Sequence, residues 1–249
     1  MQLTHQFNSI CIDWNHLLAV PKLRVFLKEL HRQGQTPAAQ LLVQPWLSYK
    51  DYDPNSTAQS PMYFGLGVEQ FAEAYLKHYG QIRHKLSNVK MTSSVGSSTA
   101  DLGVDATAQS TGQIRMSKTS RIAEKGNTVY IQVKGTLNSS KLYTANDGNR
   151  IPNFTTNALS SAIKGGEAYK ARYILWTTGR GLHHSLEEMS NGFMEIIDYN
   201  TISKAVENDI EFWNELRAAV GLTDLARSAI LQDPEFTDNN RIMAEDAES

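Results

Sequence analysis

The stretch TVYIQVKGT, residues 128–136, decides the fold of this chain. β-Branched and aromatic side chains alternate in it with polar ones, which is typical of a β-strand. Successive side chains of a strand point to opposite faces, so Gln132 and Lys134 share one face while Val133 points into the core from the other. The sequence therefore predicts a strand that carries an amide and an ammonium group on the same side.

Predicted strands and helices alternate outward from this stretch. Upstream, GVEQFAEAYLKHYG at 67–80 has apolar residues at spacings of three and four, which predicts an amphipathic helix that stops at Gly80. VDATA at 104–108 predicts a short strand. The elements predicted downstream are a helix at 155–170, a buried strand at 171–179, a short helix at 183–192, a strand at 193–199 and a long helix at 201–221 capped by Thr201 or Ser203. This order indicates an α/β fold with a mixed central sheet flanked by helices.

The chain is expected to divide into three parts. Residues 1–60 are predicted to form a helical N-terminal extension, because the apolar residues of LRVFLKELHRQG at 23–34 recur at helical spacing. Residues 61–221 are predicted to hold the α/β domain, and the acidic residues 222–249 a flexible tail. A polar excursion at 109–127 is predicted to be an extended hairpin or an inserted loop within the domain.

Composition narrows the class of protein. Hydrophobic residues make up 41% of the 249 residues and charged residues 20%, which is ordinary for a globular protein. The single cysteine, Cys11, excludes an internal disulfide and a zinc site built on thiolates, and it fits a reducing compartment. The N-terminus lacks the apolar run of a secretory signal, and no apolar stretch is long enough to span a membrane. We therefore expect a cytoplasmic protein, associated with the nucleoid when it acts.

The formal net charge of −2 conceals an uneven distribution of charge. Between Ser60 and Arg180 the chain has 15 Lys and Arg residues against 7 Asp and Glu residues, whereas the flanking segments are acidic. A basic middle is compatible with a face that binds phosphates. Basic residues scattered over a solvated surface would give the same balance, so charge leaves both interpretations open.

Three side chains of complementary chemistry are predicted to converge. If the strand at 104–108 pairs with the strand at 128–134, Asp105 reaches the face that carries Gln132 and Lys134. Carboxylate and carbonyl oxygens are the ligands that Mg²⁺ prefers, and the backbone oxygen of Val133 is a further candidate. An ammonium group beside a cation can orient a water and offset negative charge on a phosphate. Taken alone, the tripeptide Gln132–Lys134 also fits a half-buried strand with two outward polar residues.

In this context the chain resembles the PD-(D/E)xK nuclease superfamily, and within it the Mrr-like restriction endonuclease group. The matching segments, in the family's order, are GVEQFAEAYLKHYG, DLGVD, YIQVKGT, the helix–strand pair ending in YILWTTGRGL, and MEIIDYNTISKAVENDIEFW. They span Gly67 to Trp213. The resemblance implies a restriction-endonuclease-like sheet and hydrolysis of DNA with the help of Mg²⁺ or Mn²⁺.

The resemblance also implies residue roles. Asp105 and Gln132 correspond to the positions that surround the metal, and Lys134 to the lysine that assists the attacking water. The family's first helix often supplies a glutamate, for which Glu69 and Glu73 are the candidates; both also fit exposed helix positions. Gln132 stands where most relatives carry glutamate, although the Mrr-like group itself uses glutamine. The basic residues of the excursion are predicted to contact the DNA backbone or to belong to a solvated loop: Arg115, Lys118, Arg121 and Lys125.

The function predicted from the sequence is a divalent-metal-dependent endonuclease that cuts DNA, within a restriction, defence, repair or replication system. The alternative is a nuclease-fold subunit with weak or lost cleavage that docks DNA or assembles a larger complex. Expected partners are DNA and either a second copy of the chain or other subunits of a nucleic-acid-processing complex. His183 and His184 have no spaced partner motif and are predicted to lie at the surface, and Phe212 and Trp213 are predicted to be core residues.

Overall fold

The computed structural model describes residues 1, 13, 14, 18, 22–36, 60–91, 104–115, 122–123, 125–144, 171–189 and 194–220. The helix predicted at 155–170 and the tail predicted at 222–249 lie outside these residues. The helices are α2 (Leu23–Gly34), α4 (Ser60–His84), α6 (His184–Met189), α7 (Tyr199–Val206) and α8 (Ile210–Ala219). The strands are β1 (Leu86–Met91), β2 (Ala106–Ser110), β3 (Ile114–Arg115), β4 (Ile122–Ala123), β5 (Thr128–Lys134), β6 (Leu142–Tyr143), β7 (Arg172–Thr177), β8 (Gly181–Leu182) and β9 (Met194–Ile197).

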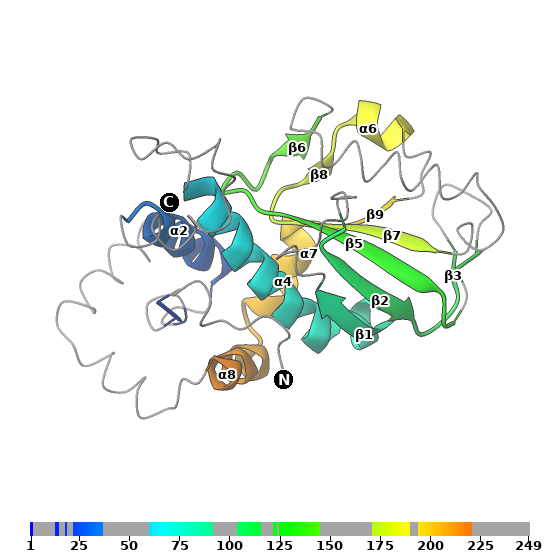
Figure 1. Ribbon diagram of the computed structural model, residues 1–249, viewed down its shortest axis with the longest axis horizontal. Coiled ribbons are helices and arrows are strands. Elements are labelled where there is room, and N and C mark those ends of the chain that lie inside the picture. Colours follow the sequence, from blue (N-terminus) through cyan, green and yellow to red (C-terminus); the bar gives the residue numbers. More distant parts are fainter. Residues whose placement is uncertain are drawn as a thin grey trace, which may run out of the picture. The chain divides into compact units, whose positions relative to one another are not determined.

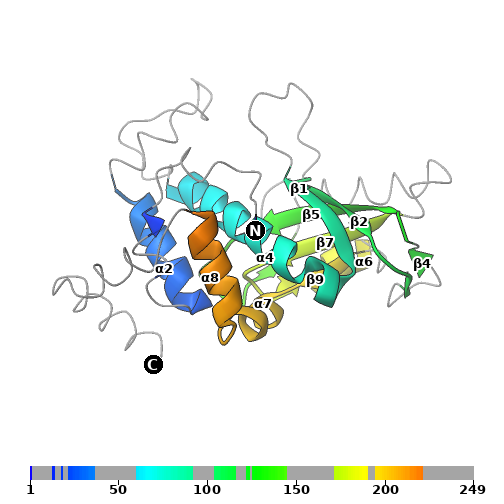
Figure 2. The ribbon, with the colours of Figure 1, turned by 90° about the horizontal axis from the view of Figure 1, so that it is seen from below.

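A mixed five-stranded sheet forms the centre of the fold, in the order β1-β2-β5-β7-β9 (Figure 1). β1 pairs with β2 and β2 with β5 in antiparallel orientation, whereas β5, β7 and β9 are parallel. Figure 2 shows the same strands from below. The predicted α/β class with a mixed sheet is therefore confirmed.

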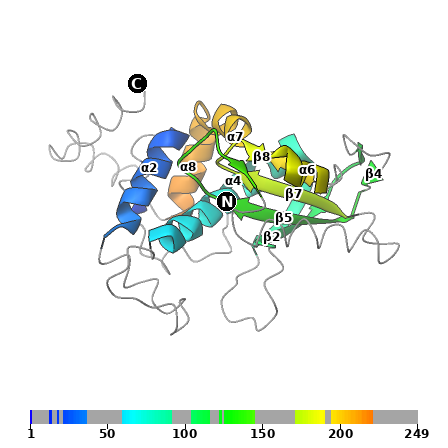
Figure 3. The ribbon, with the colours of Figure 1, turned by 90° about the horizontal axis from the view of Figure 1, so that it is seen from above.

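The two faces of the sheet have different surroundings. One face, the α4 face, carries Val133 and Trp176, which are paired in the β5–β7 register. The ring of Trp176 lies 5.9 Å from that of Tyr75 in α4. The opposite face, the Gln132 face, carries Gln132 and Leu175. Leu175 packs there in a cluster with Tyr143 and with residues of β8 and α6, and α6 lies beside β8 (Figures 1 and 3).

Contacts divide the chain into two units, Met1–Phe71 with Ile202–Ser249, and Ala72–Thr201. The second unit contains the whole five-stranded sheet. The first unit has an aromatic core, in which the ring of Phe71 lies 4.5 Å from Phe26, 5.8 Å from Phe212 and 5.9 Å from Trp213. The prediction that Phe212 and Trp213 are core residues is confirmed, because both are buried.

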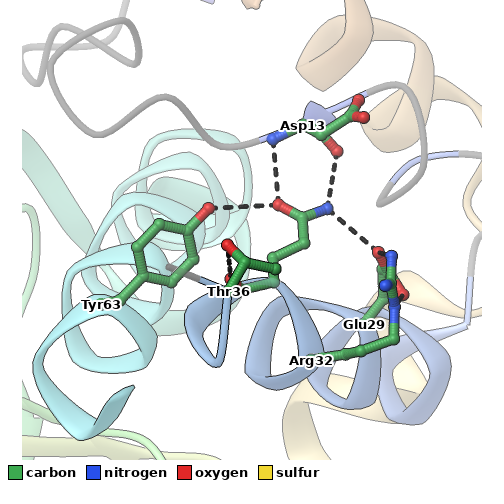
Figure 4. Close-up of polar contacts among 6 residues, drawn as sticks. Asp13, Glu29, Arg32, Thr36 and Tyr63 are labelled. Atoms are coloured by element: carbon green, nitrogen blue, oxygen red, sulfur yellow. Dashed lines mark hydrogen bonds and ion pairs between the residues drawn. The ribbon is translucent and has the colours of Figure 1, made fainter. Parts of the chain in front are cut away.

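A hydrogen-bond network in the first unit attaches the N-terminal segment to α2 (Figure 4). The Gln33 amide accepts from the Asp13 backbone N–H at 2.9 Å and donates to the Asp13 carbonyl at 3.0 Å. The Tyr63 hydroxyl donates to Gln33 Oε1 at 3.1 Å, and Gln33 Nε2 donates to the buried Glu29 carboxylate at 3.1 Å. Each polar atom of this buried amide therefore has a partner, as buried polar groups require.

Gly80 does not end α4, and the prediction of a stop there was wrong. The helix continues to His84, and Lys85 then adopts a left-handed φ of 52°. A Cβ on Gly80 would lie 3.3 Å from the Leu86 Cβ of the following strand. The glycine therefore fits the close approach of β1 rather than a helix terminus.

The long helix predicted at 201–221 is two helices, α7 and α8. The Asp209 carboxylate accepts a hydrogen bond from the Phe212 N–H at 3.0 Å and caps the start of α8. Neither Thr201 nor Ser203 caps α7, which begins at Tyr199. Asp198 accepts from the Thr201 backbone N–H at 2.9 Å, so the acidic residue before the helix takes the role predicted for the hydroxyls.

The strand β1 was not predicted. Its register with β2 shifts between Ser87 and Lys90, and Asn88 has a φ of 52°. A bulge interrupts the alternation of side chains from which a strand is recognised in the sequence. The excursion at 109–127 contains the antiparallel pair β3–β4, which corresponds to the hairpin alternative.

Candidate functional site

The carboxylate of Asp105 is fixed to the backbone of β5. The β2–β5 ladder begins with the pair Ala106–Ile131, so Val133 lies two residues beyond it. The Asp105 N–H donates to the Ile131 carbonyl at 2.9 Å, and the Val133 N–H donates to Asp105 Oδ2 at 2.7 Å. A side-chain oxygen thus takes the role that a strand carbonyl would have had, because a strand N–H needs an acceptor. This places Asp105 beside the residue that separates Gln132 from Lys134.

The amide of Gln132 is fully buried, with an exposed fraction of 0%. Neither its Oε1 nor its Nε2 has a hydrogen-bond partner among the residues that the structure describes. Burying an amide without partners costs about 1–3 kcal/mol in proteins. The described part of the chain therefore leaves the lone pairs of Gln132 Oε1 without a hydrogen bond. Gln132 is the strand neighbour of Val133, the residue that Asp105 binds.

Lys134 is the last residue of β5 and is half-buried. The period of two in the strand places it on the Gln132 face, as predicted. Its carbonyl accepts a hydrogen bond from the Thr178 N–H at 3.1 Å, beyond the end of β7. The structure thus brings Asp105, Gln132 and Lys134 to one end of β5, while joint coordination of one cation by Asp105 and Gln132 stays a prediction.

The Val133 backbone oxygen faces the same side of β5 as Asp105. A strand residue directs its N–H and C=O to the same neighbour, and the Val133 N–H is bound to Asp105. Carboxylate, amide and backbone carbonyl oxygens suit a hard cation such as Mg²⁺, which retains several waters when few protein ligands are present. The donor set therefore fits the predicted metal in chemical type, although no group of three or more His, Cys, Asp or Glu side chains within the described ranges is placed to hold a metal.

The two glutamates predicted on the first helix differ in their surroundings. Glu73 is fully buried and forms an ion pair with Lys77, with 2.6 Å between Oε1 and Nζ. It is therefore not an exposed helix position. Glu69 is half-buried and belongs to the first unit, whereas Asp105 and Gln132 belong to the second. A catalytic role for Glu69 or Glu73 stays a prediction.

The basic excursion is described only in part. Lys125 is exposed, and Arg115 lies in β3. Lys118 and Arg121 fall outside the described residues. Phosphate contact by these side chains stays a prediction.

A buried polar cluster that the sequence analysis missed joins the C-terminal end of α4 to β7 and β9. Arg172 is 1% exposed, and its Nε and Nη2 donate to the two oxygens of Glu195 at 2.8 and 2.9 Å. Its Nη2 also donates to the His84 carbonyl at 3.0 Å. An arginine at the start of the otherwise apolar strand RYILWT is the signal in the sequence, because arginine is buried only when it is paired.

The same cluster contains a histidine that stays neutral. His84 Nε2 lies 2.9 Å from the Tyr75 hydroxyl. Burial, and then the charge of Arg172, lower the pKa of His84 to about 4, and burial raises the pKa of Tyr75 above its usual value. Around neutral pH both members of this pair are uncharged, and their contact joins the middle of α4 to its last residue.

The rings of His183 and His184 contact one another in a tilted arrangement, with 3.9 Å between centroids and 48° between planes, and His183 Nδ1 lies 3.1 Å from the Ser185 hydroxyl. His184 is exposed, in line with the predicted surface role. No helix in the described part of the chain has both the length and the apolar character needed to cross a membrane.

Comparisons of the chain with models of protein families, with curated proteins and with solved structures found no match.

Proposed function

We propose that this chain is a divalent-metal-dependent endonuclease that hydrolyses phosphodiester bonds of DNA. The observation that carries the proposal is the hydrogen bond of 2.7 Å from the Val133 N–H to Asp105 Oδ2. It fixes a carboxylate beside the strand residue between Gln132 and Lys134. The motif resemblance to the Mrr-like nucleases, described above, supports the same assignment.

In this proposal Asp105, the Gln132 amide oxygen and the Val133 carbonyl hold Mg²⁺ or Mn²⁺. When bound, such an ion stabilises negative charge on the scissile phosphate and lowers the pKa of a bound water. Asp105 keeps its orientation through the Val133 N–H, so little reorganisation is needed when a cation arrives. Because Gln132 is fully buried, its amide oxygen lies in an unfavourable environment, and binding a cation would relieve this cost.

Lys134 has a different role from the three oxygen donors. Its ammonium group repels a cation but attracts the negative charge that develops on the phosphate as the bond breaks. It also orients the attacking water by hydrogen bonding. Arg115, Lys118, Arg121 and Lys125 are proposed to bind neighbouring phosphates, which gives affinity that is independent of DNA sequence.

One observation favours a second function, a nuclease-fold subunit that binds DNA or assembles a larger complex without cutting. Asp105 is the only carboxylate among the three proposed ligands, and Gln132 is neutral and 0% exposed. A neutral ligand binds Mg²⁺ less strongly than a carboxylate. Weak metal affinity would leave DNA binding without efficient cleavage.

Plasmid nicking distinguishes the two functions. The parental chain is incubated with supercoiled plasmid and Mg²⁺, Mn²⁺ or EDTA, beside Lys134→Ala and the matched control Lys90→Ala, which removes an exposed lysine of β1. Lys134→Ala is expected to lower cleavage at least about a hundredfold with DNA affinity nearly unchanged, because Lys134 acts only in the transition state. Cleavage by Lys134→Ala at the parental rate would refute this mechanism. A parental chain that binds DNA but cuts with neither ion would favour the second function.

A further inference from the structure

Two threonines exchange hydrogen bonds beyond the ends of β5 and β7. The Thr136 N–H donates to Thr178 Oγ1 at 2.7 Å, and Thr178 Oγ1 donates to the Thr136 carbonyl at 2.7 Å. The side chain of Thr178 thus binds both backbone groups of Thr136, much as a neighbouring strand residue would. Thr178 is fully buried, so water does not compete for these bonds.

The backbone of Thr178 binds the same segment at a second point. Its N–H donates to the Lys134 carbonyl at 3.1 Å. One residue therefore holds the chain on both sides of Gly135. Strand ends fray when their last groups lack partners, so these three bonds fix the backbone from which the Lys134 side chain extends.

The turn of residues 135–141, which follows Lys134, is held at its far end by the residues that follow Thr178. The Arg180 N–H donates to the Lys141 carbonyl at 2.8 Å. A Cβ on Gly179 would lie 2.9 Å from that carbonyl, so only glycine fits this approach. Residues 178–180 thus fasten the turn 135–141 at both ends, and we call this arrangement the Thr178 clasp.

We propose that Thr178 is a positioning residue for Lys134, acting through the backbone of Lys134 and Thr136. The inference rests on the proposed function, in which Lys134 stabilises charge on a phosphate. Such a role needs a side chain held close to its productive place, and a displacement of about 1 Å can lower a rate about a hundredfold. The Thr178 hydroxyl supplies this constraint without touching DNA.

Two substitutions separate the hydroxyl from the shape of the side chain. Thr178→Val keeps the branched shape and removes the hydroxyl, whereas Thr178→Ser keeps the hydroxyl. Ser110→Ala is the matched control, because Ser110 is a buried hydroxyl at the other end of β2 that donates to the Gly112 carbonyl at 3.0 Å. For each protein we would measure turnover at saturating plasmid, the Kd for DNA, thermal unfolding and amide hydrogen exchange at Lys134.

Thr178→Val is expected to lower turnover between about tenfold and a hundredfold, with the Kd for DNA within about twofold of the parental value. Exchange at the Lys134 amide should accelerate about tenfold, as expected when buried hydrogen bonds are lost nearby. Thr178→Ser should restore most of the turnover. Ser110→Ala should lower the unfolding temperature without lowering turnover, which separates positioning from general stability.

Three results would overturn the inference: parental turnover in Thr178→Val, equal loss in Thr178→Ser, or equal loss in Ser110→Ala. A parental protein that cuts no DNA would instead contradict the proposed function. Hydrogen exchange then decides the clasp alone: faster exchange at Lys134 in Thr178→Val but not in Ser110→Ala supports it, and unchanged exchange overturns it.

Discussion

Replacing Gln132 with leucine is expected to raise the stability of the chain and to remove cleavage. The side chain is fully buried, and neither amide atom has a partner within the described residues. An unpaired buried amide costs about 1–3 kcal/mol, and leucine removes that cost at similar volume. The free energy of unfolding should therefore rise by about 1–3 kcal/mol. For a chain of this length each kcal/mol corresponds to about 2–4 °C, so Tm should rise by several degrees.

Thermal and urea unfolding followed by circular dichroism measure this change, and plasmid nicking measures the loss of activity. Gln109→Leu is the matched control: Gln109 is an exposed residue of β2 whose side chain accepts one exposed hydrogen bond, from Asn88 Nδ2 at 2.8 Å, so its replacement should lower stability by no more than about 1 kcal/mol. Addition of Mg²⁺ should raise the Tm of the parental chain. At a Mg²⁺ concentration a hundred times its Kd, the free energy of unfolding should rise by up to about 2.7 kcal/mol, and the rise should be smaller in Gln132→Leu.

A less stable Gln132→Leu protein would show that the amide makes hydrogen bonds that hold the fold, and Gln132 would then not be an unpaired metal ligand. A Gln132→Leu protein that cuts DNA at the parental rate would remove Gln132 from the reactive centre. Either result is readily distinguished from misfolding, because the urea m-value reports whether the same surface is exposed on unfolding.

Three further predictions concern the metal, DNA affinity and pH. Asp105→Ala should stop cleavage through lost metal affinity, so nicking should return partly at high Mn²⁺, and no return at any Mn²⁺ concentration would argue against Asp105 as a ligand. Replacing the four basic residues of the excursion by alanine should lower the slope of log Kd against log salt by up to about four, and an unchanged slope would assign them to a solvated loop. Because the pKa of His84 is lowered to about 4 in the folded state, its contribution to stability is present above its unfolded value near 6.5 and is lost as pH falls towards 4. His84→Asn should flatten the fall of Tm over that range, and an equally steep fall would place the acid sensitivity elsewhere.

The sequence predicted those elements in which one physical pattern dominates. The alternation in β5 is typical of a strand with one buried face, and the continuous apolar character of β7 is typical of a strand buried on both faces. Both strands are found as predicted. β1 was missed because Asn88 interrupts its alternation. Gly80 was misread because glycine is used both for helix termini and for close packing, and only the position of Leu86 tells the two apart.

The candidate site was predictable only as far as local geometry determines it. That Gln132 and Lys134 share a face follows from the period of a strand. The bond between Asp105 and the Val133 N–H does not, because it depends on where the β2–β5 ladder begins. The contacts of Arg172 with Glu195 and His84 join residues distant in the sequence, and no local pattern specifies them.

The topology of the sheet explains why these residues gather at one edge. Because β2 is antiparallel to β5, the residue that precedes β2 lies where β5 ends, and this brings Asp105 to Val133. Because β7 is parallel to β5, the two strands end at the same edge, and this brings Thr178 to Lys134. A carboxylate, a lysine and the residue that fixes the lysine backbone thus reach one place from three separate segments. In the proposed function, the antiparallel neighbour would supply the charge for a cation, and the parallel neighbour the rigidity that a group acting in a transition state requires.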